Sequence, residues 1–86
     1  MDFKVYLLIT KIKNRYVSYV GYTNNIKNRL KLHNSGKGAK FTRGNKWVLI
    51  YQKRYKSKSE AMKQEFKLKN DITKRSNIKL RYINNL

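Results

Sequence analysis

The sequence predicts an α+β fold, in which a three-stranded antiparallel sheet is flanked by helices in the order ββαβαα. Two stretches rich in Val, Ile, Leu and Tyr lie close together near the N-terminus and are separated by the polar sequence KIKNR, a pattern typical of a β-hairpin. A third stretch of this kind begins at Trp47 and is followed by two patterns of helical period. Because 86 residues leave room for one small core, we expect residues 1–86 to form a single domain.

The three strands are expected at residues 3–10, 16–22 and 47–55. The first two should pair as a hairpin across the KIKNR loop. The third strand begins with a nearly continuous apolar run, as strands buried on both faces do. We therefore expect it to be the central strand of the sheet.

Three helices are expected, at residues 24–34, 57–70 and, with a weaker pattern, 73–84. Small polar residues that can cap a helix N-terminus stand before the first two, namely Thr23 or Asn24 and Ser57 or Ser59. Between the first helix and the third strand, residues 34–46 (NSGKGAKFTRGNK) should form a basic loop, because they hold three of the four glycines of the chain.

Charge is the strongest feature of the composition. Lys and Arg number 22 against four Asp and Glu, which gives a formal net charge of +18. AT-rich codons would raise the lysine content, but they do not explain why acidic residues are so few. A domain this basic favours a polyanionic partner, and nucleic acid is the default partner.

Several classes of protein are excluded by the composition. The chain has no Cys, so it can form neither a disulfide framework nor a thiolate metal site. Its longest apolar runs, residues 5–9 and 47–51, are far too short to span a membrane or to form the core of a signal peptide. We therefore expect a soluble, cytoplasmic protein that is monomeric and has no evident protein partner.

The second helix carries a carboxylate on its apolar face. That face is formed by Ala61, Met62, Phe66, Leu68 and Ile72. Glu65 falls within it, and a carboxylate in such a place is unfavourable unless it is paired, bound to a metal or open to a cleft. A simple ion pair with Lys69, one turn further along the helix, is the alternative explanation.

The first helix shows a similar feature. His33, the one histidine of the chain, continues the apolar line of Ile26 and Leu30, and Arg29 lies one turn before it on the adjoining edge. A lone histidine on an apolar face is more often a satisfied core residue than a catalyst. An arginine beside it, next to a basic loop, suits phosphodiester chemistry, because such chemistry uses proton transfer and a cation together.

Two tyrosines of the predicted hairpin should share a face of the sheet. With a turn near residues 12–13, Tyr6 and Tyr19 would lie roughly opposite each other. Packing alone would explain such a pair. Gly21 lies on the same face as Tyr19 and would leave room for a backbone to approach.

Four segments together resemble the GIY-YIG nuclease domain: VYLL, YVGYT, NNIKNRLKLHNSGKGAKFTRG and SEAMKQEFKLK. The resemblance covers about residues 3–70 and is greatest to the small standalone bacterial (YhbQ-like) members and to the nuclease domain of Slx-type structure-selective endonucleases. The first motif departs from Gly-Ile-Tyr, since residues 4–6 read KVY, and the second reads YVG at residues 19–21. Both tyrosines remain, so the resemblance implies a working enzyme.

The resemblance implies an active site made of Tyr6, Tyr19, Arg29, His33 and Glu65. It implies a metal-dependent DNA endonuclease that hydrolyses phosphodiester bonds and leaves 5′-phosphate and 3′-hydroxyl ends. Tyr6 or Tyr19, helped by His33, would deprotonate the attacking water, and Arg29 would stabilise the charge of the transition state. Only Glu65 among the four acidic residues lies on the active face, so a single Mg²⁺ is expected, for which Mn²⁺ should substitute.

The positive surroundings of the catalytic tyrosine lead to an expectation about pH. Nearby cationic groups favour a phenolate, so we expect the pKa of that tyrosine to be lowered. The rate of cleavage should then rise between about pH 7 and 9.

The basic loop is expected to contact the DNA backbone through Lys37, Lys40 and Arg43, unless it is only a flexible, solvated segment. Its sequence SGKGAKFT lacks the spacing of a P-loop. We expect single-stranded or branched DNA to be the substrate, with low sequence specificity and a role in DNA repair, recombination or processing. The alternative function is a non-catalytic basic nucleic-acid-binding protein, architectural or ribosome-associated, which explains the charge but not the positions of Glu65 and His33.

Overall fold

The computed structural model describes residues 2–86, and its helices and strands follow the predicted order. The strands are β1 (Phe3–Ile12), β2 (Arg15–Thr23) and β3 (Val48–Tyr55), and the helices are α1 (Ile26–Asn34), α2 (Lys58–Asn70) and α3 (Ile72–Asn84). A short 3₁₀ helix, η1 (Lys40–Thr42), lies in the basic loop and was not predicted. The sheet is antiparallel throughout, which confirms the predicted fold class.

The central strand is β1, because the strand order is β2-β1-β3. The prediction that the third strand is central was therefore wrong. All side chains from Val5 to Thr10 are buried, whereas the second half of β3 exposes Gln52, Lys53 and Arg54. The polar residues 52–54 interrupt β3 after its first half, whereas the buried stretch of β1 is continuous from residue 5 to 10, so β1 is the strand that is covered on both faces.

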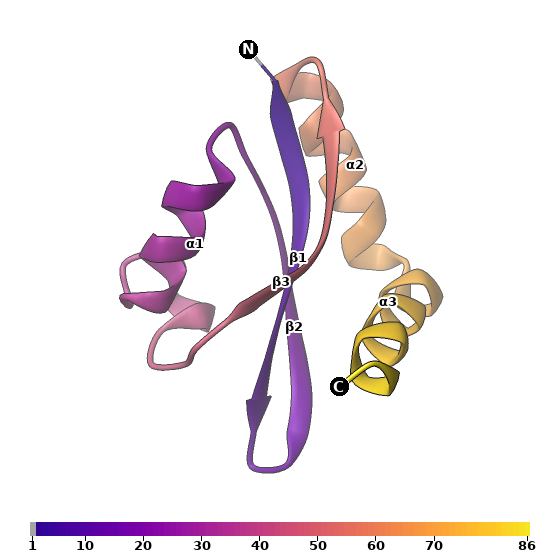
Figure 1. Cartoon of the computed structure of the whole chain (residues 1–86). Helices are drawn as coiled ribbons and strands as arrows, with labels where there is room; N and C mark the ends of the chain where they lie inside the picture. Colours follow the sequence, from indigo (N-terminus) through magenta and orange to yellow (C-terminus); the bar gives the residue numbers. More distant parts are fainter. Residues whose placement is uncertain (1) are drawn as a thin grey trace.

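The two faces of the sheet are covered by different helices (Figure 1): α1 lies on one side, and α2 and α3 lie on the other. Side chains that alternate along β1 fill the two layers. Val5 and Leu7 pack with Ala61 of α2, and Tyr6 and Leu8 belong to the layer beneath α1. Within residues 2–86, no helix combines the length and the apolar character needed to cross a bilayer.

The hairpin turn lies one residue later than predicted. Lys13 and Asn14 both have positive φ (49° and 66°), as the two central residues of a type I′ turn require. The pairing consequently shifts by two positions, so that Tyr6 lies opposite Gly21 and Tyr19 lies opposite Leu8. Because a shift of two keeps the side chains on the same face, Tyr6 and Tyr19 are diagonal neighbours, not directly opposite partners.

The cap of the first helix also differs from the prediction. Asn25, not Thr23 or Asn24, caps α1, since its side chain accepts a hydrogen bond from the backbone N–H of Asn28 at 3.1 Å. Ser57 caps α2, as predicted, by accepting from the backbone of Glu60 at 3.1 Å.

The apolar face of α2 is narrower than predicted. Ala61 and Leu68 are buried against the sheet, but Met62 and Phe66 are 49% and 67% exposed. Two buried positions seven residues apart are enough to hold α2 on the sheet, and the other apolar side chains of the pattern point outward. Ile72, which was assigned to this face, is also exposed and begins α3.

Candidate active site

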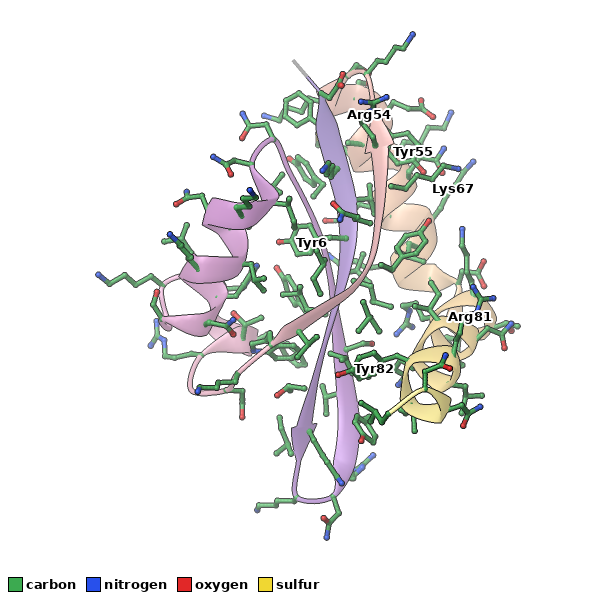
Figure 2. All side chains as sticks on the ribbon, in the orientation of Figure 1. Tyr6, Arg54, Tyr55, Lys67, Arg81 and Tyr82 are labelled. Carbon is green, nitrogen blue, oxygen red and sulfur yellow. The ribbon has the colours of Figure 1, made fainter. Side chains whose placement is uncertain are left out.

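Tyr6 projects from the central strand into the layer between the sheet and α1 (Figure 2). Its side chain is 1% exposed, and the strand partner opposite it is Gly21. A Cβ at Gly21 would lie 2.6 Å from Tyr6 Cζ and would also overlap the hydroxyl oxygen. Gly21 therefore leaves room for the phenol ring of Tyr6, and not for a backbone as predicted.

His33 is completely buried (0% exposed), and both of its ring nitrogens have partners. Nδ1 lies 2.8 Å from Thr42 Oγ1, and Nε2 lies 2.9 Å from the hydroxyl of Tyr6. The Thr42 hydroxyl donates its one proton to the carbonyl of Ala39 at 2.9 Å, so toward His33 it can only accept. This arrangement places the proton of His33 on Nδ1 and leaves Nε2 to accept a hydrogen bond from Tyr6.

The loop after α1 holds Thr42 in place. The indole Nε1 of Trp47 donates to the carbonyl of Thr42 at 2.8 Å, and the backbone N–H of Trp47 donates to the side chain of Asn34 at 2.6 Å. Gly38 lies so close to the ring of His33 that a Cβ there would be 2.9 Å from its Cγ. The basic loop is therefore packed against the histidine, and it is not merely a flexible, solvated segment.

Tyr19 is half-buried and lies beside the Tyr6–His33 pair. Its ring centroid is 6.5 Å from that of Tyr6 and 5.0 Å from that of His33. Phe41 of η1 stacks on the ring of Tyr19 at 6.1 Å, with an angle of 22° between the two planes. The structure thus brings the two predicted tyrosines and the predicted histidine together in one aromatic cluster.

The side chain of Arg29 approaches the hydroxyl of Tyr6 from α1. It is half-buried, and its Nε is buried without a hydrogen-bond partner among residues 2–86. A buried donor without a partner is uncommon in folded proteins, and Nε of Arg75 on α3 is a second case within residues 2–86. The Arg29 guanidinium is therefore a cation that lies next to the hydroxyl of Tyr6.

The pKa values of Tyr6 and His33 are both shifted. Burial raises the pKa of Tyr6 to about 12, although hydrogen bonding and charge from Arg29 act in the opposite direction. The expectation of a lowered pKa was wrong for this tyrosine, because loss of solvent around the phenolate outweighs the nearby cation. Burial, and after it Arg29, lowers the pKa of His33, so its ring is neutral at pH 7.

Glu65 lies on α2, which covers the opposite face of the sheet, and is close enough that its charge contributes to the raised pKa of Tyr6. Its side chain is 17% exposed and its Oε1 lies 3.6 Å from Lys69 Nζ. The ion pair considered as the alternative explanation therefore exists. It does not exclude a metal ion, because Lys69 is itself half-exposed and can move away.

The acidic residues near the cluster limit the kind of metal site. Among residues 2–86 no group of three His, Cys, Asp or Glu side chains is placed to hold a metal. Glu65 alone suits a Mg²⁺ that keeps most of its water and takes a phosphate oxygen from a substrate. A site with two metal ions would need several more carboxylates.

The basic residues of the loop, Lys37, Lys40 and Arg43, are all exposed. The two ion pairs found among residues 2–86 join Arg54 to Asp2 and Lys69 to Glu65, so neither occupies the loop. The loop cations are therefore available to an external anion.

Sequence reasoning missed Thr42, Gly38, Trp47 and Phe41. Thr42 is buried and fixes the tautomer of His33, but it stands nine positions away in an irregular loop, where no periodicity relates it to the helix. Gly38 was noted only as a loop glycine. The one available signal was the density of small residues around GKGA, which allows a backbone to approach a side chain closely.

A profile of the GIY-YIG catalytic domain matches residues 3–79. Together with the fold and the cluster of Tyr6, Tyr19 and His33, this match shows that the chain belongs to the GIY-YIG family, a family of nuclease domains.

Relatives of the chain are small bacterial proteins. The UPF0213 protein OB0043 of Oceanobacillus iheyensis is 43% identical over 70 residues, which cover 80% of each chain. The UPF0213 protein SH2523 of Staphylococcus haemolyticus is 46% identical over 67 residues, or 77% of this chain and 80% of that one. The solution NMR structure of the UPF0213 protein BH0048 from Bacillus halodurans is 34% identical, covers 96% of this chain and 85% of that chain, and gives a TM-score of 0.46. These names state no activity.

Replacing Gly21 by Ala is expected to displace the ring of Tyr6 and break its hydrogen bond to His33. Adding a methyl group to a packed site costs about 1–3 kcal/mol of unfolding free energy. Urea denaturation measures this loss, and Ser18→Ala on the same strand is the control, because it adds no volume. An unfolding free energy equal to that of the wild type would mean that Gly21 does not make the space for Tyr6.

Proposed function

We propose that the protein is a metal-dependent DNA endonuclease that leaves 5′-phosphate and 3′-hydroxyl ends. The observation that carries this proposal is the chain of hydrogen bonds from Tyr6 through His33 to Thr42, with a buried, unpartnered guanidinium nitrogen of Arg29 beside it among residues 2–86. A phenol that donates to a neutral imidazole is a proton relay, and a buried cation next to it is suited to a phosphate.

The relay defines how an attacking water would lose its proton. Tyr6 has a pKa of about 12 and cannot act as a free phenolate at neutral pH. We assign it the role of accepting a proton from water while its own proton passes to Nε2 of His33. Thr42 keeps the other ring nitrogen protonated, so that Nε2 is always the acceptor. Tyr19, half-buried beside both rings, is assigned the role of positioning the water and the substrate.

Two further residues would stabilise charge. The guanidinium of Arg29 would bind the phosphate and stabilise the charge that develops on it in the transition state. Glu65 would hold Mg²⁺, which when bound stabilises the leaving 3′-oxygen and which Mn²⁺ can replace. Lys37, Lys40 and Arg43 would contact the DNA backbone on either side of the reacting phosphate.

The rate should depend on pH through His33. Nε2 accepts a proton only while the ring is neutral, and the pKa of His33 is lowered from its usual 6.5. Activity should therefore stay constant through neutral pH and fall only in acid, as pH drops through that lowered pKa. No rise from tyrosine ionisation is expected between pH 7 and 9, because Tyr6 titrates near 12.

Single-turnover rates between pH 5 and 9 measure this profile. The fall of the rate in acid is the acid limb of this profile. Tyr6→Phe should lose most of the rate, and the rate that remains should show no acid limb. Tyr19→Phe should have a lower rate but keep the acid limb. An acid limb that is unchanged in Tyr6→Phe would remove the Tyr6–His33 relay from the mechanism.

The substrate that we propose is single-stranded or branched DNA with little sequence specificity, which suits a role in repair, recombination or processing. Oligonucleotides of one sequence, prepared as a single strand, a duplex and a 5′ flap, would be cut side by side in Mg²⁺. Cleavage in the single strand and near the flap junction should exceed cleavage of the duplex. Equal cleavage of all three would refute the preference, and binding without any cleavage would favour the non-catalytic alternative.

A further inference from the structure

Phe41 is an exposed aromatic ring at the edge of the site. Its side chain is 59% exposed, although it lies next to the buried rings of the cluster. One side of the ring stacks on Tyr19 at 6.1 Å and 22°, and Trp47 lies 6.1 Å away at 42°. The aromatic cluster therefore continues outward from His33 through Tyr19 and ends at Phe41, whose remaining surface faces solvent.

The backbone that carries Phe41 is fixed by its neighbours. It belongs to η1, where the N–H of Thr42 donates to the carbonyl of Ala39 at 3.1 Å. The carbonyl of Thr42 accepts from Trp47 Nε1 at 2.8 Å, and its hydroxyl bonds to His33. An exposed ring on a fixed backbone is already oriented for a ligand, so little conformational entropy would be lost on binding.

The charge around Phe41 indicates the chemistry of its partner. Lys40 directly precedes it in the sequence, Lys37 and Arg43 belong to the same loop, and all three are exposed. In the described chain, residues 2–86, none of these three cations takes part in the ion pairs that are formed. Exposed cations in the loop that carries the ring favour a partner that presents a flat group and an anion together, as a nucleotide does with its base and its phosphate.

We infer that Phe41 is a stacking platform for one unpaired base of single-stranded DNA. The stacking itself does not depend on the proposed nuclease function. The position of this base next to the reacting phosphate does rest on that function, because Tyr19 contacts both Phe41 and the Tyr6–His33 pair. Base stacking on an aromatic side chain tolerates any sequence, because every base has a flat face. A paired base within a duplex is already stacked and cannot take this position without flipping out.

The test is binding without cleavage. Fluorescence anisotropy of a labelled ten-nucleotide poly-dT strand and of a duplex of the same length, both in EDTA, would be measured for the wild type, Phe41→Ala and Phe41→Tyr. Phe41→Ala should weaken single-strand binding by about five- to hundredfold and duplex binding by less than about twofold. Phe41→Tyr should retain both affinities, which also shows that the loop is folded.

Phe66→Ala is the matched control, because Phe66 is similarly exposed (67% against 59% for Phe41) but lies on α2, away from the loop. It should bind both DNAs as the wild type does. Wild-type affinity of Phe41→Ala for the single strand, or an equal loss for the single strand and the duplex, would overturn the inference. Because no metal is present, this result is independent of whether the protein cuts DNA, and a wild type that never cuts would contradict the nuclease function alone.

Discussion

Replacing Glu65 by Gln is expected to abolish Mg²⁺-dependent cleavage while DNA binding stays within about twofold of the wild type. The change keeps the shape of the side chain and removes a carboxylate whose charge contributes to the raised pKa of Tyr6. DNA binding should persist because it depends on the overall positive charge, which changes only from +18 to +19 when one negative charge is lost. Cleavage rate and affinity would be measured on the same single strand, the latter in EDTA.

Glu60→Gln is the control for this prediction, because it makes the same change of charge on the same helix. Glu60 is exposed and accepts a hydrogen bond from Gln64 at 3.0 Å. It has no proposed role in the active site. A second measurement does not depend on cleavage: the EPR signal of free Mn²⁺ should fall on adding the wild type and Glu60→Gln, but not Glu65→Gln. If Glu65→Gln cuts DNA at the wild-type rate, Glu65 has no part in the mechanism.

Replacing Arg29 by Ala should lower the single-turnover rate by about 10²- to 10³-fold, which is the usual effect of removing one group that stabilises transition-state charge. The side chain is half-buried beside Tyr6, and its Nε has no partner within residues 2–86. Lys27→Ala removes one positive charge from an exposed position of the same helix and should leave the rate almost unchanged.

The Arg29 variant should also show a changed pH profile. Because the charge of Arg29 helps to lower the pKa of His33, its removal should move the acid limb toward higher pH. A reduced rate with the acid limb at its original pH would mean that Arg29 acts on the substrate without influencing His33. A rate equal to that of Lys27→Ala would exclude Arg29 from catalysis.

Local patterns in the sequence were sufficient to predict the fold class. The strand and helix order follows from apolar runs, capping residues and glycines, all of which act over a few residues. Strand order did not follow from them, because it depends on which strand can be covered on both faces. The apolar runs at residues 5–9 and 47–51 are equally long, so run length alone did not distinguish the central strand.

A polar residue in the apolar face of a predicted helix was the signal that located part of the candidate site. His33 was identified in this way and lies in the cluster with Tyr6 and Tyr19. The register of the hairpin was wrong by two residues, because it depends on the φ angles of Lys13 and Asn14, which are not the Asn-Gly pair that usually marks a type I′ turn.

The remaining features of the site depend on burial and on long-range contacts, which local sequence patterns do not reveal. The number of cations suggested a lowered tyrosine pKa, but the pKa of Tyr6 is raised because its ring is 1% exposed. Likewise, nothing in the spacing of Thr42 indicates that its hydroxyl bonds to His33, since that contact depends on how an irregular loop folds back.

The most direct test of the proposed nuclease is the cutting of circular single-stranded DNA, which has no ends for an exonuclease. In Mg²⁺ the wild type should convert the circle to linear fragments, and EDTA should prevent this. The fragments should accept a 5′ label from a polynucleotide kinase only after phosphatase treatment, since each new 5′ end carries a phosphate. A circle that is bound but stays intact in both Mg²⁺ and Mn²⁺ would contradict the account.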